Sequence, residues 1–190
     1  MVTIKEKIQD HFEHKKYLKI IRTVSNGIDK TNNGYIVDHN SKFVILQETD
    51  DFLLNGYVIV PIDAIKKIRF NKWDKYYAKM MALEGQCENV GITYNLEMST
   101  WQSIFTTLKA NNLNVIIECE DPEIDSFTIG PIIKTDSKHV FIQNFDPSGK
   151  LDSELTSIDF ESITSITFAD RYINVFSKYL RQPKSIKSKK

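Results

Sequence analysis

The sequence predicts a mostly β protein with flanking helices, built from two tandem units that each contain one helix, five short strands and a short closing helix. The chain matches itself at a shift of 96 places, which pairs Gly34 with Gly130 and Ile36 with Ile132. Short runs rich in Ile, Val and aromatic residues are separated by turns of Asn, Asp, Ser and Gly. Helical periodicity appears only before and after each set of such runs.

The first unit is predicted to begin with a capped helix. Thr3-Ile4-Lys5-Glu6 has the form of a capping box, in which the threonine hydroxyl accepts from a backbone N–H three residues on and the glutamate reaches back. One apolar face then repeats every four residues, at Ile4, Ile8 and Phe12.

Five strands are expected to follow, with turn residues between them. The turn signals are Ser25-Asn26-Gly27, Asn32-Asn33-Gly34, Asn40-Ser41 and Thr49-Asp50-Asp51. The expected strands are Tyr17–Val24, Tyr35–Asp38, Lys42–Gln47, Asn55 or Gly56 to Val60, and Ala64–Phe70. Helical periodicity returns over Trp73–Leu83 and closes the unit.

The second unit repeats this order. Ser99-Thr100-Trp101-Gln102 has the capping-box form again, and Trp101, Ile104, Phe105 and Leu108 make an apolar helical face. Strands are expected at Val115–Glu118, Phe127–Lys134, Val140–Gln143, about Glu154–Thr156 and Ile163–Phe168, with a helix at Arg171–Leu180. The predicted organisation is a first unit at 1–84, a linker at 85–98, a second unit at 99–180 and a basic, disordered tail at 181–190.

Charge is distributed unevenly along a chain whose formal net charge is zero. Residues 99–180 carry six basic and twelve acidic side chains, whereas residues 181–190 carry five basic and none acidic. Proteins that hold nucleic acid mainly through phosphates usually have an excess of Lys and Arg, so zero net charge disfavours that class without forbidding a local patch.

No motif identifies a reaction, and we expect a non-catalytic protein without metal or cofactor. Gly-rich phosphate loops, G-x-S-x-G and H-E-x-x-H are all missing from the sequence. Cys87 and Cys119 form no CxxC pair, so they are expected to be free thiols in a reducing cytoplasm. With no apolar window of spanning length, no membrane association is expected.

The strand pattern resembles the Sm-like (LSM) family of small bent barrels and, within it, the Hfq-like bacterial RNA chaperones. The motifs that carry the resemblance are Gly34-Tyr35-Ile36, Phe43-Val44-Ile45-Leu46 and Val60-Pro61-Ile62-Asp63-Ala64-Ile65. The match covers most of each unit and rests on hydrophobic pattern, which other SH3-like barrels share. It implies two tandem Sm-like or SH3-like five-stranded bent barrels.

The resemblance also implies an RNA site. In the family, bases stack on the aromatic residue that opens strand three, which is Phe43 here, beside Lys42; Lys138 and His139 take these places in the second copy. The family's Lys-His pair before strand five is replaced by Ile62 and Asp63, which cannot donate to phosphate. In the basic tail, Lys184 and Lys187 are candidate phosphate contacts.

Two functions therefore stay open from the sequence. One is a diverged RNA-binding or regulatory protein that uses the residues just named. The other is a protein–protein interaction or scaffold module without nucleic-acid binding, which the acidic second unit and the missing Lys-His pair favour. Under either, open edge strands of the barrels are expected to support a homo-oligomer.

Overall fold

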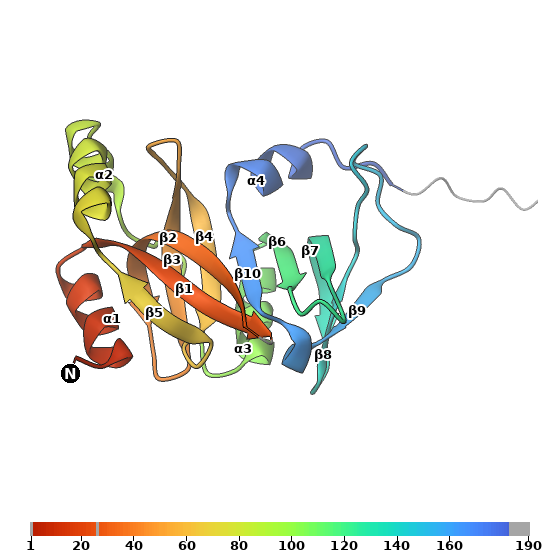
Figure 1. Ribbon diagram of the computed structural model, residues 1–190. Helices are drawn as coiled ribbons and strands as arrows, with labels where there is room; N and C mark the ends of the chain where they lie inside the picture. The colour runs from red at the N-terminus through yellow and green to blue at the C-terminus, as the bar shows by residue number, and fades with distance from the viewer. Residues whose placement is uncertain (1, 26, 183–190) are drawn as a thin grey trace, which may run out of the picture.

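The computed structural model describes residues 2–25 and 27–182 and shows a mostly β protein (Figure 1). Ten strands form one antiparallel sheet in the order β5-β1-β2-β3-β4-β10-β6-β7-β8-β9, and four α-helices lie around it. No helix in the described part of the chain is both long and apolar enough to cross a membrane.

The order of elements repeats along the chain. The first half contains α1 (Ile4–Glu13), β1 (Tyr17–Ser25), β2 (Ile28–His39), β3 (Phe43–Asp50), β4 (Leu53–Pro61), β5 (Ile65–Arg69) and α2 (Lys72–Leu83). A short 3-10 turn, η1 (Gln86–Asn89), precedes the second half. That half contains α3 (Trp101–Ala110), β6 (Asn114–Cys119), β7 (Ser126–Thr135), β8 (His139–Ile142), β9 (Thr156–Asp159), η2 (Phe160–Ser162), β10 (Ser165–Phe168) and α4 (Arg171–Ser177).

Both predicted capping boxes exist, one of them a residue later than expected. Thr3 and Glu6 exchange the two capping hydrogen bonds at the start of α1. At α3 the cap is Thr100, not Ser99, because the Ser103 hydroxyl is the group that reaches back to the Thr100 backbone N–H. Trp101 is therefore the first residue of α3, as Ile4 is of α1, and both helices are ten residues long.

We call the two halves of the chain the first and second repeats. Their strands pair in the same way. β1 pairs with β2 and also with β5, and β6 pairs with β7 and also with β10. An irregularity in register follows Ile36 in β2 and Ile132 in β7, again at a shift of 96. The fifth strand of each repeat therefore returns to its first strand.

One predicted turn is wrong. β2 begins at Ile28 rather than Tyr35, and Asn32-Asn33-Gly34 lies inside it. The asparagine side chains bond across the sheet instead of turning the chain, since Asn33 donates to the hydroxyl and carbonyl oxygens of Thr49. Gly34 is needed because the backbone of β3 approaches it closely at Gln47.

The fourth strand of the second repeat also lies later than expected, at Thr156–Asp159 rather than about Glu154–Thr156. Ile158 is buried there and pairs with Val140, which fixes the register of β9 against β8. The apolar contact outweighs the weak turn signals near Glu154.

The two repeats join edge to edge through β4 and β10. Their antiparallel register places Ile59 opposite Ile166 and Tyr57 opposite Phe168. One hydrophobic core runs across this joint and includes residues of both repeats. The segment predicted as a linker adds Val90, Leu96 and Met98 to the same core.

A buried arginine crosses the joint. The guanidinium of Arg22 on β1 donates to Glu120 Oε2 at 2.7 Å, to the Thr164 carbonyl at 3.1 Å and to Asn32 Oδ1 at 2.7 Å. The side chains of Arg22 and Glu120 are only 2% and 8% exposed. Nearby, Asn32 also donates to Glu48, whose carboxyl has a raised pKa because it is desolvated.

The Arg22–Glu120 pair makes a first prediction. Arg22→Met should lower the free energy of unfolding by about 3–5 kcal/mol, because it leaves Glu120 buried without its main counter-charge. Urea unfolding monitored by circular dichroism measures this loss. The double variant Arg22→Met/Glu120→Gln should recover part of it, and equal losses in the single and double variants would contradict the assignment.

Gly34 and Gly130 make a second prediction. A Cβ at Gly34 would collide with the carbonyl oxygen of Gln47 and lie 2.9 Å from its carbonyl carbon, and Gly130 meets Gln143 in the same way. Either glycine-to-alanine change should cost more than about 2 kcal/mol of unfolding free energy. Gly91→Ala is the matched control, since nothing lies within 4 Å of a Cβ there.

Candidate functional site

Four of the residues predicted to bind RNA lie where the third strand of each repeat begins: Lys42 and Phe43 in the first, and Lys138 and His139 in the second. In the first repeat, Asn40 Oδ1 accepts from the backbone N–H groups of Lys42 and Phe43. In the second, Asp136 Oδ1 accepts in the same way from Lys138 and His139. The two turns are equivalent, so the predicted residues do occupy matching positions.

Phe43 is not a free stacking platform. Its side chain is only 6% exposed, and the ring of Trp101, from α3 of the other repeat, packs on it with centroids 4.5 Å apart. Lys42 is exposed, but its Nζ donates to the Ser99 carbonyl at 3.0 Å. A base could stack on Phe43 only after the Trp101 ring had moved.

The second pair, Lys138 and His139, is more accessible than Phe43. His139 is partly exposed, with Nδ1 3.2 Å from Asp136 Oδ1, and Lys138 is exposed. Neither residue lines the pocket described next. Lys184 and Lys187 lie outside the described residues.

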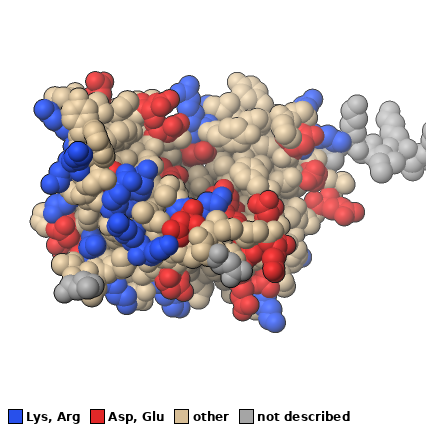
Figure 2. Space-filling model, in the orientation of Figure 1, with Lys and Arg blue, Asp and Glu red and all other residues tan. Residues whose placement is uncertain are grey.

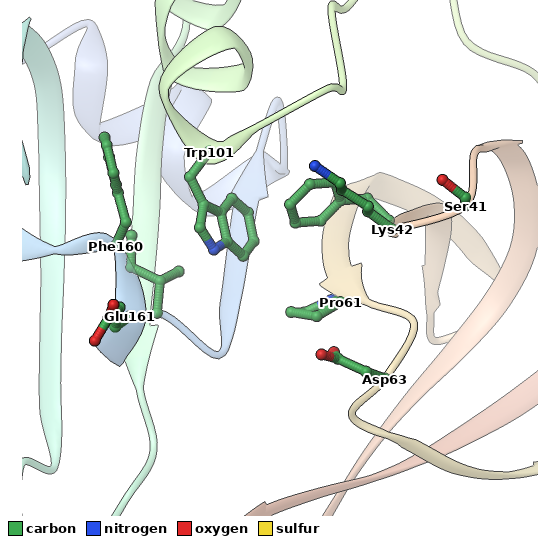
Figure 3. A pocket seen from close by; sticks show the side chains of 9 residues that line it. Ser41, Lys42, Pro61, Asp63, Trp101, Phe160 and Glu161 are labelled. Carbon is green, nitrogen blue, oxygen red and sulfur yellow. The ribbon is translucent and has the colours of Figure 1, made fainter. Parts of the chain in front are cut away.

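A pocket of about 630 Å³ opens between the two repeats beside Phe43 (Figure 3). The first repeat contributes Ser41, Lys42, Phe43, Pro61 and Asp63, and the second contributes Trp101, Phe160, Glu161 and Ile163. In Figure 3 the Trp101 indole lies between Asp63 on one side and Glu161 on the other. A shift of 98 places pairs Asp63 with Glu161, so each repeat supplies a carboxylate from the same connection before its fifth strand.

The charges of this pocket favour a cation. Two exposed carboxylates line it, and the one ammonium group, on Lys42, already bonds to a carbonyl oxygen. The aromatic rings are held in place, because Phe160 stacks on Phe105 with centroids 5.9 Å apart. Carboxylates repel phosphate, whereas carboxylates and aromatic faces together stabilise an ammonium or guanidinium group.

Sequence reasoning found Lys42 and Phe43 but missed the second wall of the pocket. Trp101 was assigned to an apolar helical face, and neither Phe160 nor Glu161 was a candidate. The pocket forms only where the repeats meet, and the linear sequence does not show that meeting.

Metal chemistry is not indicated by the arrangement of ligand-type side chains. Within 2–25 and 27–182, no three His, Cys, Asp or Glu residues gather in a way that could hold a metal ion. Cys119 is buried, and Cys87, which is partly buried, contacts the Tyr35 hydroxyl at 3.6 Å.

No protein-family model, curated protein or solved structure matches the chain.

Proposed function

We propose that this chain is a non-catalytic tandem Sm-like barrel protein that binds a basic segment of a protein partner in the pocket between its repeats. The strand connectivity supports the barrel interpretation, since the fifth strand of each repeat pairs with its first. Bent five-stranded barrels of the Sm-like and SH3-like kinds are built in this way.

The observation that carries the proposal is the lining of the inter-repeat pocket. Asp63 and Glu161 line the same pocket as the rings of Trp101 and Phe160. An arginine or lysine side chain inserted there gains charge pairing from the carboxylates and cation–π contact from the rings. The same features disfavour a phosphate, which the RNA hypothesis requires at this place.

RNA remains the second candidate because of a different surface. Basic side chains gather over β1 and β5 in Figure 2, whereas acidic ones predominate over the second repeat. The strand register puts Lys19 opposite Arg69 and Ile21 opposite Lys67, so the basic side chains share one face of the sheet. Backbone phosphates could bind on this face, away from the predicted pocket.

The homo-oligomer predicted from the sequence is proposed to form by pairing of the two edge strands of the sheet. The joint inside the chain pairs the fourth strand of one repeat, β4, with the fifth strand of the other, β10. The outermost strands of the sheet are a fifth strand, β5, and a fourth strand, β9. β5 exposes Lys66 and Lys67, and β9 and the turn after it expose Asp159 and Glu161, so two copies present opposite charges for head-to-tail pairing.

Binding of a basic peptide provides a third prediction. In a Trp73→Phe background, which leaves Trp101 as the reporter, the peptide acetyl-Gly-Arg-Gly-Lys-Gly-amide should change the tryptophan emission. Asp63→Asn/Glu161→Gln should weaken binding by about tenfold, because two attractive charges are removed. Asp152→Asn/Glu154→Gln, on exposed residues outside the pocket, should have no effect.

The same titration with a U-rich RNA separates the two candidate functions. RNA binding that Lys19→Gln/Lys67→Gln weakens, and that neutralising Asp63 and Glu161 leaves unchanged, would replace the peptide proposal with the RNA one. A peptide affinity that the pocket variant leaves unchanged would also contradict it.

Self-association provides a fourth prediction. Sedimentation equilibrium should show reversible assembly at micromolar concentration, weakened by Lys66→Glu/Lys67→Glu, since both changes place like charges opposite Asp159 and Glu161 of the next copy. Mixing this variant with one carrying Asp159→Lys/Glu161→Lys should restore association. A monomer throughout the concentration range would rule out edge pairing.

A further inference from the structure

Exposed apolar side chains gather on a surface remote from the inter-repeat pocket. They belong to α2, to the tip of the β3–β4 hairpin and to α4, which lie along the same side of the sheet in Figure 1. The members of this apolar edge are Trp73, Tyr76 and Leu83 on α2, Phe52 and Leu53 on the hairpin, and Tyr172 and Val175 on α4. Single exposed apolar residues are ordinary, but a group of this size marks an interaction surface.

Two grooves run along the apolar edge, one on each side of the hairpin tip. The groove beside α2 has a volume of about 370 Å³ and is lined by Phe52, Leu53, Met80 and Leu83 among others. The groove beside α4 has a volume of about 680 Å³ and includes Val175 in its lining. Leu53 lines both, so the grooves adjoin at this side chain, which is 51% exposed.

The hairpin tip has a strained backbone and carries a partly exposed Phe52. Asp50 pairs with Leu53, and the two residues between them, Asp51 and Phe52, have φ values of 44° and 64°. Glycine or asparagine normally occupies such positions, and a bulky residue there is an outlier. The Phe52 ring stacks on Tyr77 with centroids 4.8 Å apart, yet 38% of the residue remains exposed. Strain of this kind at an exposed tip points to a use in binding rather than in folding.

The rim of the grooves is acidic. Asp50, Asp51 and Glu84 line them, and the one basic lining residue is Arg171. A partner that buries apolar side chains here must therefore carry positive charge beside them.

The apolar side chains at this surface favour recognition through side chains rather than through the backbone. The hairpin strands are paired along much of their length, β3 with β2 and β4, and β4 with β3 and, over residues 57–59, with β10. Side-chain recognition of this kind occurs when the apolar face of an amphipathic helix lies in a groove.

We infer that the apolar edge is a second docking site, which takes an amphipathic helix of a protein partner with Lys or Arg beside its apolar face. The site is independent of the proposed function, because it shares no residue with the inter-repeat pocket. Apolar residues of the helix fill the two grooves on either side of Leu53, and its basic residues face Asp50, Asp51 and Glu84.

A display library of random 16-residue peptides tests this inference. Peptides would be selected on the full chain and counter-selected on Leu53→Ser/Val175→Ser, a variant of two exposed residues whose change should leave the fold intact. Selected sequences should carry apolar residues at i, i+3, i+4 and i+7 with Lys or Arg beside them. By fluorescence anisotropy, the most enriched peptide should bind the variant at least about tenfold more weakly.

Two further variants complete the test. Phe52→Gly should keep the hairpin, because glycine adopts a positive φ without strain, and should still weaken the peptide. Leu155→Ser, at a residue 40% exposed in the second repeat, should leave binding unchanged, as should Asp63→Asn/Glu161→Gln. Selection of acidic or non-helical peptides, or equal binding to the Leu53 variant, would overturn the inference. Self-association abolished by Leu53→Ser would assign the surface to a second copy instead.

Discussion

The pairing of β4 with β10 is the constraint on which the rest of the structure depends. It joins two similar repeats into one sheet and one core, and the buried Arg22 extends the joint from β1 of the first repeat to Glu120 of the second. Breaking such a pair leaves an uncompensated buried charge, so the repeats are held at a fixed angle rather than tethered. Both surfaces assigned to partners need that angle, because each is walled by elements of both repeats.

Local signals made much of the fold predictable from the sequence. Capping residues located α1 and α3 to within one position, and the repeat shift paired Gly34 with Gly130, which the structure shows at matching points of close backbone approach. Prediction failed where tertiary contacts override local preference. Asn32 and Asn33 read as turn residues, but cross-strand hydrogen bonds hold them inside β2.

The candidate site was only half predictable, because its walls come from different repeats. Lys42 and Phe43 were candidates through the family resemblance, which did not extend to the residues around them in the pocket. Trp101 begins α3 at the position that Ile4 occupies in α1, and it covers the Phe43 ring of the other repeat. The residue at the start of α3 thus decides whether the Phe43 ring of the other repeat is accessible, and no pattern within either repeat reveals this contact.

Covalent linkage gives the joint a property that separate chains would lack. When two subunits meet only by association, the site between them disappears on dilution, since occupancy follows concentration. Here the β4–β10 contact is intramolecular, so the pocket persists at any expression level. Its two walls are always present together, and α3 of one repeat can carry Trp101 at the position where α1 of the other repeat carries Ile4. The two repeats therefore meet like the subunits of a dimer, but each can carry different residues at equivalent positions.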